Sequence, residues 1–400
     1  MTLTFVSHDT PEPALYGAMA AILAGQQGKP LAHLAVDWNK AAYADACQHV
    51  TANGHLVTSG LLWHERLNGK SAENFWPLES LINSSSSQDL IVPLAPSQQV
   101  TFNRFAQLAR DFSIDYQVIE ISESAKGFHF NSAKEGEISK IWRRDRYGRF
   151  ITHQRLVNST SAHRLRIALV GSYQDQKGSY PATLAALGDA IDAMALNVEV
   201  IFLPPQSSAQ TLANTLASVD GVVLPGGSDM RNVAGQIRVA HYCLNHKKPI
   251  LGLCLGMQTM ATAAIQQMLG NTQANLAEAD PQAAFKTFVP LAAMPGNPVH
   301  RLGDDNMFLA AGTHLAAVLG NNTQLRYNHR FHLNPLFKDD LARSGLIISG
   351  TDRSGTIADG IEHAAHPFYL GVQGHPELTS SVEQPHPLIS AFLRAAADLQ

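Results

Sequence analysis

Short apolar runs alternate with helix-like segments between residues 164 and 254, and this alternation is the strongest constraint on the fold. The runs are "RIALVGSY", "VEVIFLP", "GVVLPGG" and "PILGLC". Runs this short predict buried strands, and the amphipathic stretches between them predict helices. Strands that alternate with helices form a parallel sheet with helices on both faces. We therefore expect an α/β, doubly wound, flavodoxin-like and mostly parallel sheet over residues 164–400.

The first 160 residues carry a shorter version of the same alternation. Strands are predicted at "LTFVS", "LAHLAV", "DLIVPL" and "DYQVIEIS". Helices are predicted at "PALYGAMAAILAG", ending at Gly25, and at "VTFNRFAQLARDF". These patterns predict a smaller α/β domain over residues 1–160. The polar, aperiodic stretch "NSTSAHR" at 158–164 predicts the linker between the two domains.

Length and composition narrow the class of protein. The chain has 400 residues, of which 45% are hydrophobic and 16% charged, with a formal net charge of −4. This balance predicts a globular protein of more than one domain and no nucleic-acid partner. Three cysteines make no disulfide framework, and no apolar run is long enough for a membrane span. We expect a cytoplasmic protein with no membrane partner.

One cysteine occupies a position with chemical meaning. Cys254 directly follows the predicted strand "PILGL" and precedes the helical stretch "MQTMATAAIQQML". Functional groups collect at the carboxyl ends of strands in doubly wound sheets, and a nucleophile at a strand–helix turn is a known arrangement. A helix N-terminus beside the sulfur favours thiolate. The alternative is a buried, inert cysteine, which we expect of Cys243 and Cys47.

A cysteine nucleophile needs a base, and the segment "FYLGVQGHPELTS" offers one. His375 follows the predicted strand "FYLGV", and Glu377 lies two residues further on, after a proline. A carboxylate in that position can orient the imidazole and stabilise its charged form. We therefore predict that Cys254, His375 and Glu377 form a catalytic triad.

These segments resemble the class I glutamine amidotransferases and, within them, the glutaminase domain of CTP synthase. The resemblance runs from about Arg164 to the C-terminus. It rests on "IALVGSY", "DGVVLPGGSDMRNVAGQI", "PILGLCLGMQ", "HRLGD", "NHRFHLN" and "HPFYLGVQGHPELTS", which occur in the family's order. It implies the family's α/β fold and an enzyme that releases ammonia from L-glutamine for transfer to an acceptor. We recognise no family in residues 1–160.

The resemblance also implies residue roles. Cys254 would form a γ-glutamyl thioester, His375 would act as general base and acid, and Glu377 would orient His375. The backbone N–H groups of Gly227 and Leu255 would stabilise the oxyanion, as the developing charge requires. The resemblance further implies substrate contacts from Gln258, Glu278 and Arg330.

The N-terminal region lacks the phosphate-binding loop that CTP synthase uses for ATP. The nearest stretch, "HERLNGKS", has His64 where the first glycine of that loop is required. In the glutaminase domain we expect no cofactor and no metal. ATP and Mg²⁺ would enter only through a synthetase partner or an acceptor step. The sequence leaves formation of a homo-oligomer open.

Two other functions remain consistent with the sequence. The chain could hydrolyse a γ-glutamyl compound other than glutamine, because Ser228 and Asp229 depart from the family's loop. It could also be a non-catalytic regulatory module, although the complete triad argues against this. Separately, the basic segment "KIWRRDRYGR" at 140–149 predicts either a solvated hairpin or a site for a phosphorylated or acidic partner.

Overall fold

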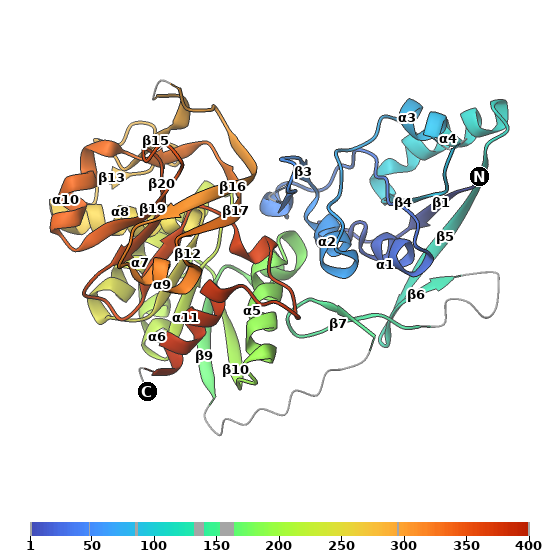
Figure 1. Cartoon of the computed structure of the whole chain (residues 1–400). Coiled ribbons are helices and arrows are strands. Elements are labelled where there is room, and N and C mark those ends of the chain that lie inside the picture. Colours follow the sequence, from blue (N-terminus) through green and yellow to red (C-terminus); the bar gives the residue numbers. More distant parts are fainter. Residues whose placement is uncertain are drawn as a thin grey trace. The chain divides into compact units, whose positions relative to one another are not determined.

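The computed structural model describes residues 2–47, 49–84, 87–131, 140–152, 164–293 and 296–398. The chain forms two compact units (Figure 1). The N-terminal unit comprises Met1–Leu156 and Gln174–Ala185, and the C-terminal unit comprises Val157–Tyr173 and Ala186–Gln400. Apart from Arg164, the linker predicted at 158–164 lies outside the described residues. Within the described ranges, no helix is long and apolar enough to cross a membrane.

The N-terminal unit is built on a sheet with the strand order β4-β1-β5-β6. Strand β1 (Thr2–Ser7) pairs in parallel with β4 (Leu90–Leu94) and with β5 (Asp115–Ser124), and β6 (Gly127–Asn131) is antiparallel to β5. The alternation of side chains along the strands builds a core on each face. The helices of this unit are α1 (Ala18–Gln27), α2 (Leu62–Asn68), α3 (Leu78–Ser84) and α4 (Gln99–Asp111), and a short pair of strands is β2 (His49–Val50) and β3 (Leu56–Val57).

The first predicted helix is wrong at both of its ends. A 3₁₀ turn at Pro13–Leu15 is separated from α1 by Gly17, whose φ is 80°. Helix α1 then continues through Gly25 and is closed by Gly28, which has a φ of 64°. A glycine in the left-handed region is the usual C-terminal stop of a helix, and Gly28 has that conformation.

The strand predicted at "LAHLAV" is also wrong, because only Leu31 bridges to Ile91 of β4. Ile91 donates to the carbonyl of Pro30 and accepts from the N–H of Ala32. The next parallel hydrogen bond would need an N–H from Pro93, which proline lacks. The ladder therefore stops after one bridge. Cys47, predicted to be buried in a helix, is instead exposed at the end of a 3₁₀ turn.

The basic segment forms a hairpin of β7 (Arg143–Arg144) and β8 (Phe150–Ile151). It is less solvated than predicted. Arg144 donates to Glu12 at 2.6 Å and Arg149 pairs with Asp145 at 2.7 Å, and the two arginine side chains are 9% and 8% exposed. The guanidinium groups of Arg144 and Arg149 are therefore already paired with carboxylates of the same unit.

The C-terminal unit contains, within the described residues, a nine-stranded sheet in the order β10-β9-β11-β12-β21-β20-β19-β16-β17. The pairs from β10 to β21 are parallel, which confirms the predicted doubly wound α/β fold. From β21 to β17 the pairs are antiparallel, an extension that the sequence analysis did not predict. The strands are β9 (Leu165–Val170), β10 (Val198–Leu203), β11 (Gly221–Leu224), β12 (Ile250–Leu253), β16 (Arg301–Leu309), β17 (Asn322–His329), β19 (Leu346–Thr351), β20 (Ala358–His363) and β21 (Tyr369–Val372).

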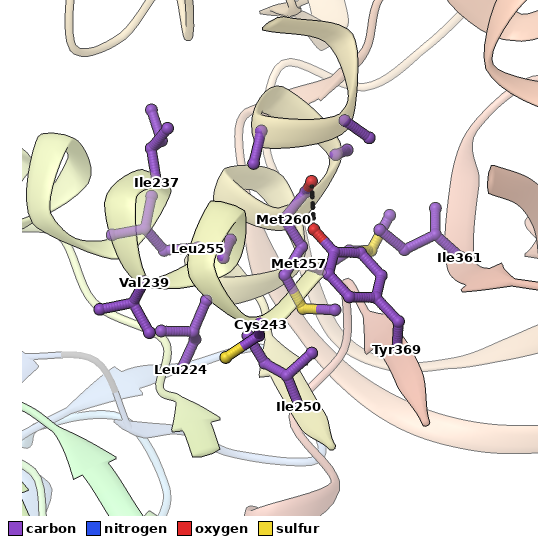
Figure 2. Packing of buried hydrophobic residues seen from close by; sticks show 14 of the residues in the cluster. Leu224, Ile237, Val239, Cys243, Ile250, Leu255, Met257, Met260, Ile361 and Tyr369 are labelled. Carbon is purple, nitrogen blue, oxygen red and sulfur yellow. Dashed lines mark hydrogen bonds between the residues drawn. The ribbon is translucent and has the colours of Figure 1, made fainter. Parts of the chain in front are cut away.

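Helices cover both faces of this sheet. One face carries the larger core, in which Cys243 is fully buried beside Leu224 and Ile250, as predicted for that cysteine (Figure 2). The hydroxyl of Tyr369 in β21 donates to the carbonyl of Met260 in α8 at 2.9 Å, and this hydrogen bond links the strand to the helix that covers it. The helices are α5 (Ala182–Ala193), α6 (Ala209–Ala217), α7 (Val233–His246), α8 (Leu255–Leu269), α9 (His314–Leu319), α10 (Lys338–Arg343) and α11 (Pro387–Asp398). Short strands β13 (Ala274–Asn275), β14 (Phe285–Lys286), β15 (Phe288–Pro290) and β18 (Phe331–Leu333) lie outside the main sheet.

Candidate active site

Cys254 lies at a sharp turn between β12 and α8. Its backbone has φ 49° and ψ −105°, in a region that non-glycine residues avoid. Its N–H is fixed by the carbonyl of Val372 at 2.8 Å. A Cβ added to Gly256 would collide with the carbonyl oxygen of Leu224, so only glycine lets the helix approach the strand this closely. The turn thus holds the thiol in one strained, defined position at the strand end.

Three adjacent parallel strands, β11, β12 and β21, are each followed at the carboxyl end by a predicted site residue. Gly226 and Gly227 follow β11, Cys254 follows β12 and His375 follows β21. A Cβ built on Gly226 would lie 3.0 Å from Cε1 of His375 and 3.4 Å from Cβ of Cys254. Gly226, the side chain of Cys254 and the imidazole of His375 therefore lie close together, because the three strands that precede them are neighbours in the sheet.

His375 and Glu377 form a buried pair. Nδ1 of His375 is 2.8 Å from Oε1 of Glu377, and the two side chains are 1% and 0% exposed. Burial alone would lower the pKa of His375, but the Glu377 carboxylate and the neighbouring Cys254 sulfur outweigh it and raise the pKa to about 10. The arrangement can therefore hold a proton on the imidazole beside the sulfur.

The raised pKa predicts a pH-dependent effect of Glu377→Gln on stability. The folded-state pKa of His375, about 10, exceeds its ordinary value of 6.5, so the protonated ring stabilises the fold fully below pH 6.5 and loses this contribution as pH rises to about 10. The difference in Tm between the wild type and Glu377→Gln should therefore shrink between these pH values. Circular dichroism melts in a pH series would measure it. A constant difference would contradict the assigned ion pair.

Two residues that the sequence analysis missed also contact the sulfur. Nε2 of Gln373 donates to Sγ of Cys254 at 3.4 Å, and the thiol points to the carbonyl of Asn328 at 3.8 Å. Gln258, one turn into α8, donates to Oε1 of Gln373 at 3.2 Å. Both missed residues belong to segments already singled out, "HPFYLGVQGHPELTS" and "NHRFHLN", but neither is a nucleophile, a base or a carboxylate.

Glu278 and Arg330 lie at the surface and interact electrostatically. Burial raises the pKa of Glu278, and the positive charge of Arg330 opposes this rise. Arg330 directly follows β17 and also lowers the pKa of His300, for which burial is the larger cause. His300 in turn contacts Oδ1 of Asn328 at 2.9 Å. Arg330 thus interacts electrostatically with both Glu278 and His300, and contacts through Asn328 lead from His300 toward the sulfur.

The predicted oxyanion donors lie at the expected strand ends. Leu255 is the first residue of α8, where N–H groups have no partner within the helix. Gly227 is half-buried in the turn after β11.

Among the described residues, no cluster of histidine, cysteine, aspartate and glutamate side chains could hold a metal ion.

Comparison with known proteins identifies the family of this chain. The family model "Glutamine amidotransferase class-I" matches residues 190–395, just over half of the chain. This chain belongs to the class I glutamine amidotransferases. The matched range includes every predicted site residue, from Gly227 to Glu377. The recognition made from the sequence motifs is thereby confirmed.

Relatives of this class I glutamine amidotransferase include CTP synthases. The CTP synthase of Rhodococcus opacus is 35% identical over 246 residues, which cover 58% of this chain and 41% of the relative. That of Saccharopolyspora erythraea is 32% identical over 250 residues, covering 59% and 44%. The structure of the Trypanosoma brucei CTPS glutaminase domain with bound acivicin is similar with a TM-score of 0.55, at 25% identity, over 58% of this chain and 94% of that domain. This chain thus spans less than half the length of these curated relatives.

Proposed function

We propose that this chain hydrolyses the side-chain amide of L-glutamine through a γ-glutamyl thioester on Cys254. The observation that carries the proposal is the buried His375–Glu377 pair beside the strained Cys254 turn. A nucleophile, a base and a group that orients the base are the three parts that this chemistry needs. All three lie within the range matched by the family.

The reaction follows from these positions. The proton of the Cys254 thiol resides on the His375 imidazole, whose raised pKa keeps the ring protonated, and the sulfur attacks the amide carbon. The same proton then passes from His375 to the departing nitrogen, so that ammonia leaves and a thioester remains. Water gives a proton to His375 and attacks the thioester. The C–S bond breaks, glutamate is released and the thiol is restored.

The other site residues have supporting roles in this proposal. The N–H groups of Gly227 and Leu255 donate to the tetrahedral oxyanion, each worth about 3 kcal/mol in the transition state. Arg330 binds the α-carboxylate of glutamine and Glu278 binds its α-ammonium. Gln258 has a buried Oε1 with no hydrogen-bond partner among the described residues, and this atom is available to the substrate.

The ammonia produced passes, in this proposal, to an acceptor. Because the relatives named CTP synthase are more than twice as long as the matched segment, the acceptor step belongs to a synthetase partner or to residues beyond that segment. The glutaminase step itself uses no cofactor, and ATP with Mg²⁺ enters only at the acceptor step. We place the protein in the cytoplasm.

A second candidate, hydrolysis of a larger γ-glutamyl compound, is favoured by the turn after β11. Asp229 is held by Arg231, with Oδ2 and Nη2 at 2.7 Å. The carboxylate also caps the following 3₁₀ turn by accepting from the N–H of Arg231. This loop differs from the family's sequence beside the proposed oxyanion position, so the pocket can have a different shape.

The test is release of glutamate and ammonia by the purified chain. We expect release from L-glutamine that is abolished in Cys254→Ala, and an increase when a partner or acceptor is present. A panel of larger γ-glutamyl amides distinguishes the second candidate, which predicts faster cleavage of these than of glutamine. Equal activity of the wild type and Cys254→Ala would overturn both candidates.

A further inference from the structure

A cavity of about 340 Å³ opens within the N-terminal unit, at the carboxyl edge of its sheet. The ends of β1 and β4, the turn before α1 and the segment 36–39 line it. In the strand order β4-β1-β5-β6, the chain leaves β1 toward β4 on one side and then returns to β5 on the other. The cavity therefore lies above the carboxyl ends of the parallel strands β1 and β4, the edge at which open α/β sheets bind ligands.

Packing confirms that the connections leave on opposite faces. Val6 and Ile91 pack in the core that includes α1. Phe5 and Val92 pack in the core that includes Phe105 of α4. Helix α1 thus covers one face of the sheet and α4 the other, and Met19 and Ala20 in the first turn of α1 border the cavity at the ends of β1 and β4.

His8 is the feature of this cavity that requires a partner. It directly follows β1, lines the cavity and is only 7% exposed. Its N–H is fixed by Leu94 at 3.1 Å and its ring packs edge-on against Phe128 at 5.5 Å. Yet neither ring nitrogen has a hydrogen-bond partner among the described residues. Buried polar groups nearly always have a hydrogen-bond partner, so the two unpartnered nitrogens of His8 support the presence of a ligand in the cavity that this residue lines.

The side chains that line the cavity indicate which charge a ligand would carry. Asp9 and Asp37 are carboxylates that line it, Glu12 also lines it but is paired with Arg144 at 2.6 Å, and no lysine or arginine is among its described lining residues. Trp38 and Met19 contribute apolar surface. Burial lowers the pKa of His8 to about 4, against the opposing charges of Asp9 and Glu12, so the ring is neutral at pH 7. A phosphate group would meet repulsion here, whereas an ammonium group would be attracted.

We propose that this cavity binds a small organic cation, with its apolar body between Trp38 and Met19, a polar group hydrogen-bonded to His8 and its ammonium at Asp9 and Asp37. The carboxylates lie at the exposed rim and His8 on the buried wall, so the ligand spans the cavity. The assignment differs from a nucleoside triphosphate site, which would need basic groups or a glycine-rich loop. It concerns the N-terminal unit alone and does not depend on glutamine hydrolysis.

The test compares matched amines and acids on the full chain by isothermal titration calorimetry. The probes are tryptamine and phenethylamine, their carboxylate counterparts indole-3-acetate and 3-phenylpropanoate, and UTP. We expect the amines to bind at least about tenfold more tightly than the acids, and UTP not to compete with them, because the rim is acidic. Tryptamine should bind more tightly than phenethylamine, since its indole N–H can donate to His8.

Two variants locate the binding. His8→Phe keeps an aromatic ring against Phe128 but removes both nitrogens, and it should reduce tryptamine affinity severalfold while phenethylamine is unaffected. Asp37→Asn should weaken both amines about two- to fivefold, as expected for an exposed charge. Asp111→Asn is the matched control, because Asp111 ends α4 and does not line the cavity. Circular dichroism checks that each variant is folded.

Three results would overturn the proposal. The first is binding of the acids or UTP as tightly as the amines. The second is amine binding that neither His8→Phe nor Asp37→Asn alters. The third is absence of amine binding at millimolar concentrations of both probes.

Discussion

His375→Asn is expected to lower kcat/KM for glutamine by about 10²–10⁴-fold, the usual contribution of a general acid–base group. The variant keeps a polar side chain next to Glu377 but cannot accept the thiol proton or deliver it to the leaving nitrogen. Steady-state release of glutamate measures the effect. The loss should appear mainly in kcat, because the imidazole acts on the reacting atoms and not on the bound substrate.

His241→Asn is the matched control for this experiment. His241 lies on α7 and contacts Oε1 of Gln266 at 2.8 Å. Gln266 is about 18 Å along α8 from Cys254, at 1.5 Å per residue. This variant should retain nearly full kcat/KM. Similar losses in both variants would mean that His375 acts through stability and not through proton transfer.

Asp359→Asn is expected to lower the free energy of unfolding by about 3–5 kcal/mol, because it removes one partner of a buried ion pair. Asp359 is fully buried and its Oδ1 lies 2.6 Å from Nη1 of Arg301. The guanidinium stacks 3.6 Å from the ring centre of Tyr327, whose hydroxyl donates to the same carboxylate at 3.2 Å. The variant leaves the charge of Arg301 without its buried counter-ion. Urea denaturation measures the loss.

Asp305→Asn tests whether burial determines this cost. Asp305 also pairs with Arg301, at 2.8 Å, but its side chain is 52% exposed. Its loss should cost only about 0.2–1 kcal/mol. Equal effects of the two variants would contradict the account. The buried pair also bears on the site, since the carbonyl of Asp359 accepts from the N–H of Gln373 at 2.8 Å.

The site could be predicted from the sequence where local pattern and topology coincide. Cys254 and His375 each follow a short apolar strand, and parallel strands place their carboxyl ends at one edge. Glu377 is close to His375 because only Pro376 separates them. The relation of His375 to Glu377 is therefore local, whereas His375 reaches Cys254 through the pairing of β12 with β21.

Other features depend on contacts that no local pattern records. The antiparallel strands β16 and β17 are joined by a connection that contains α9, and their pairing places Asn328 beside the sulfur. The strand predicted at "LAHLAV" has the right composition, but Pro93 in the neighbouring strand cannot continue the ladder. The cavity around His8 required the strand order of the N-terminal sheet, which the sequence did not provide.

The most direct test of the account is to quench the enzyme in acid during turnover of L-glutamine and identify the modified residue by mass spectrometry. The account predicts a γ-glutamyl adduct on Cys254, absent from Cys254→Ala and more abundant when thioester hydrolysis is slowed. The adduct forms only if the sulfur displaces ammonia from the amide. Release of glutamate from the wild-type chain with no adduct, together with undiminished activity in Cys254→Ala, would contradict the account.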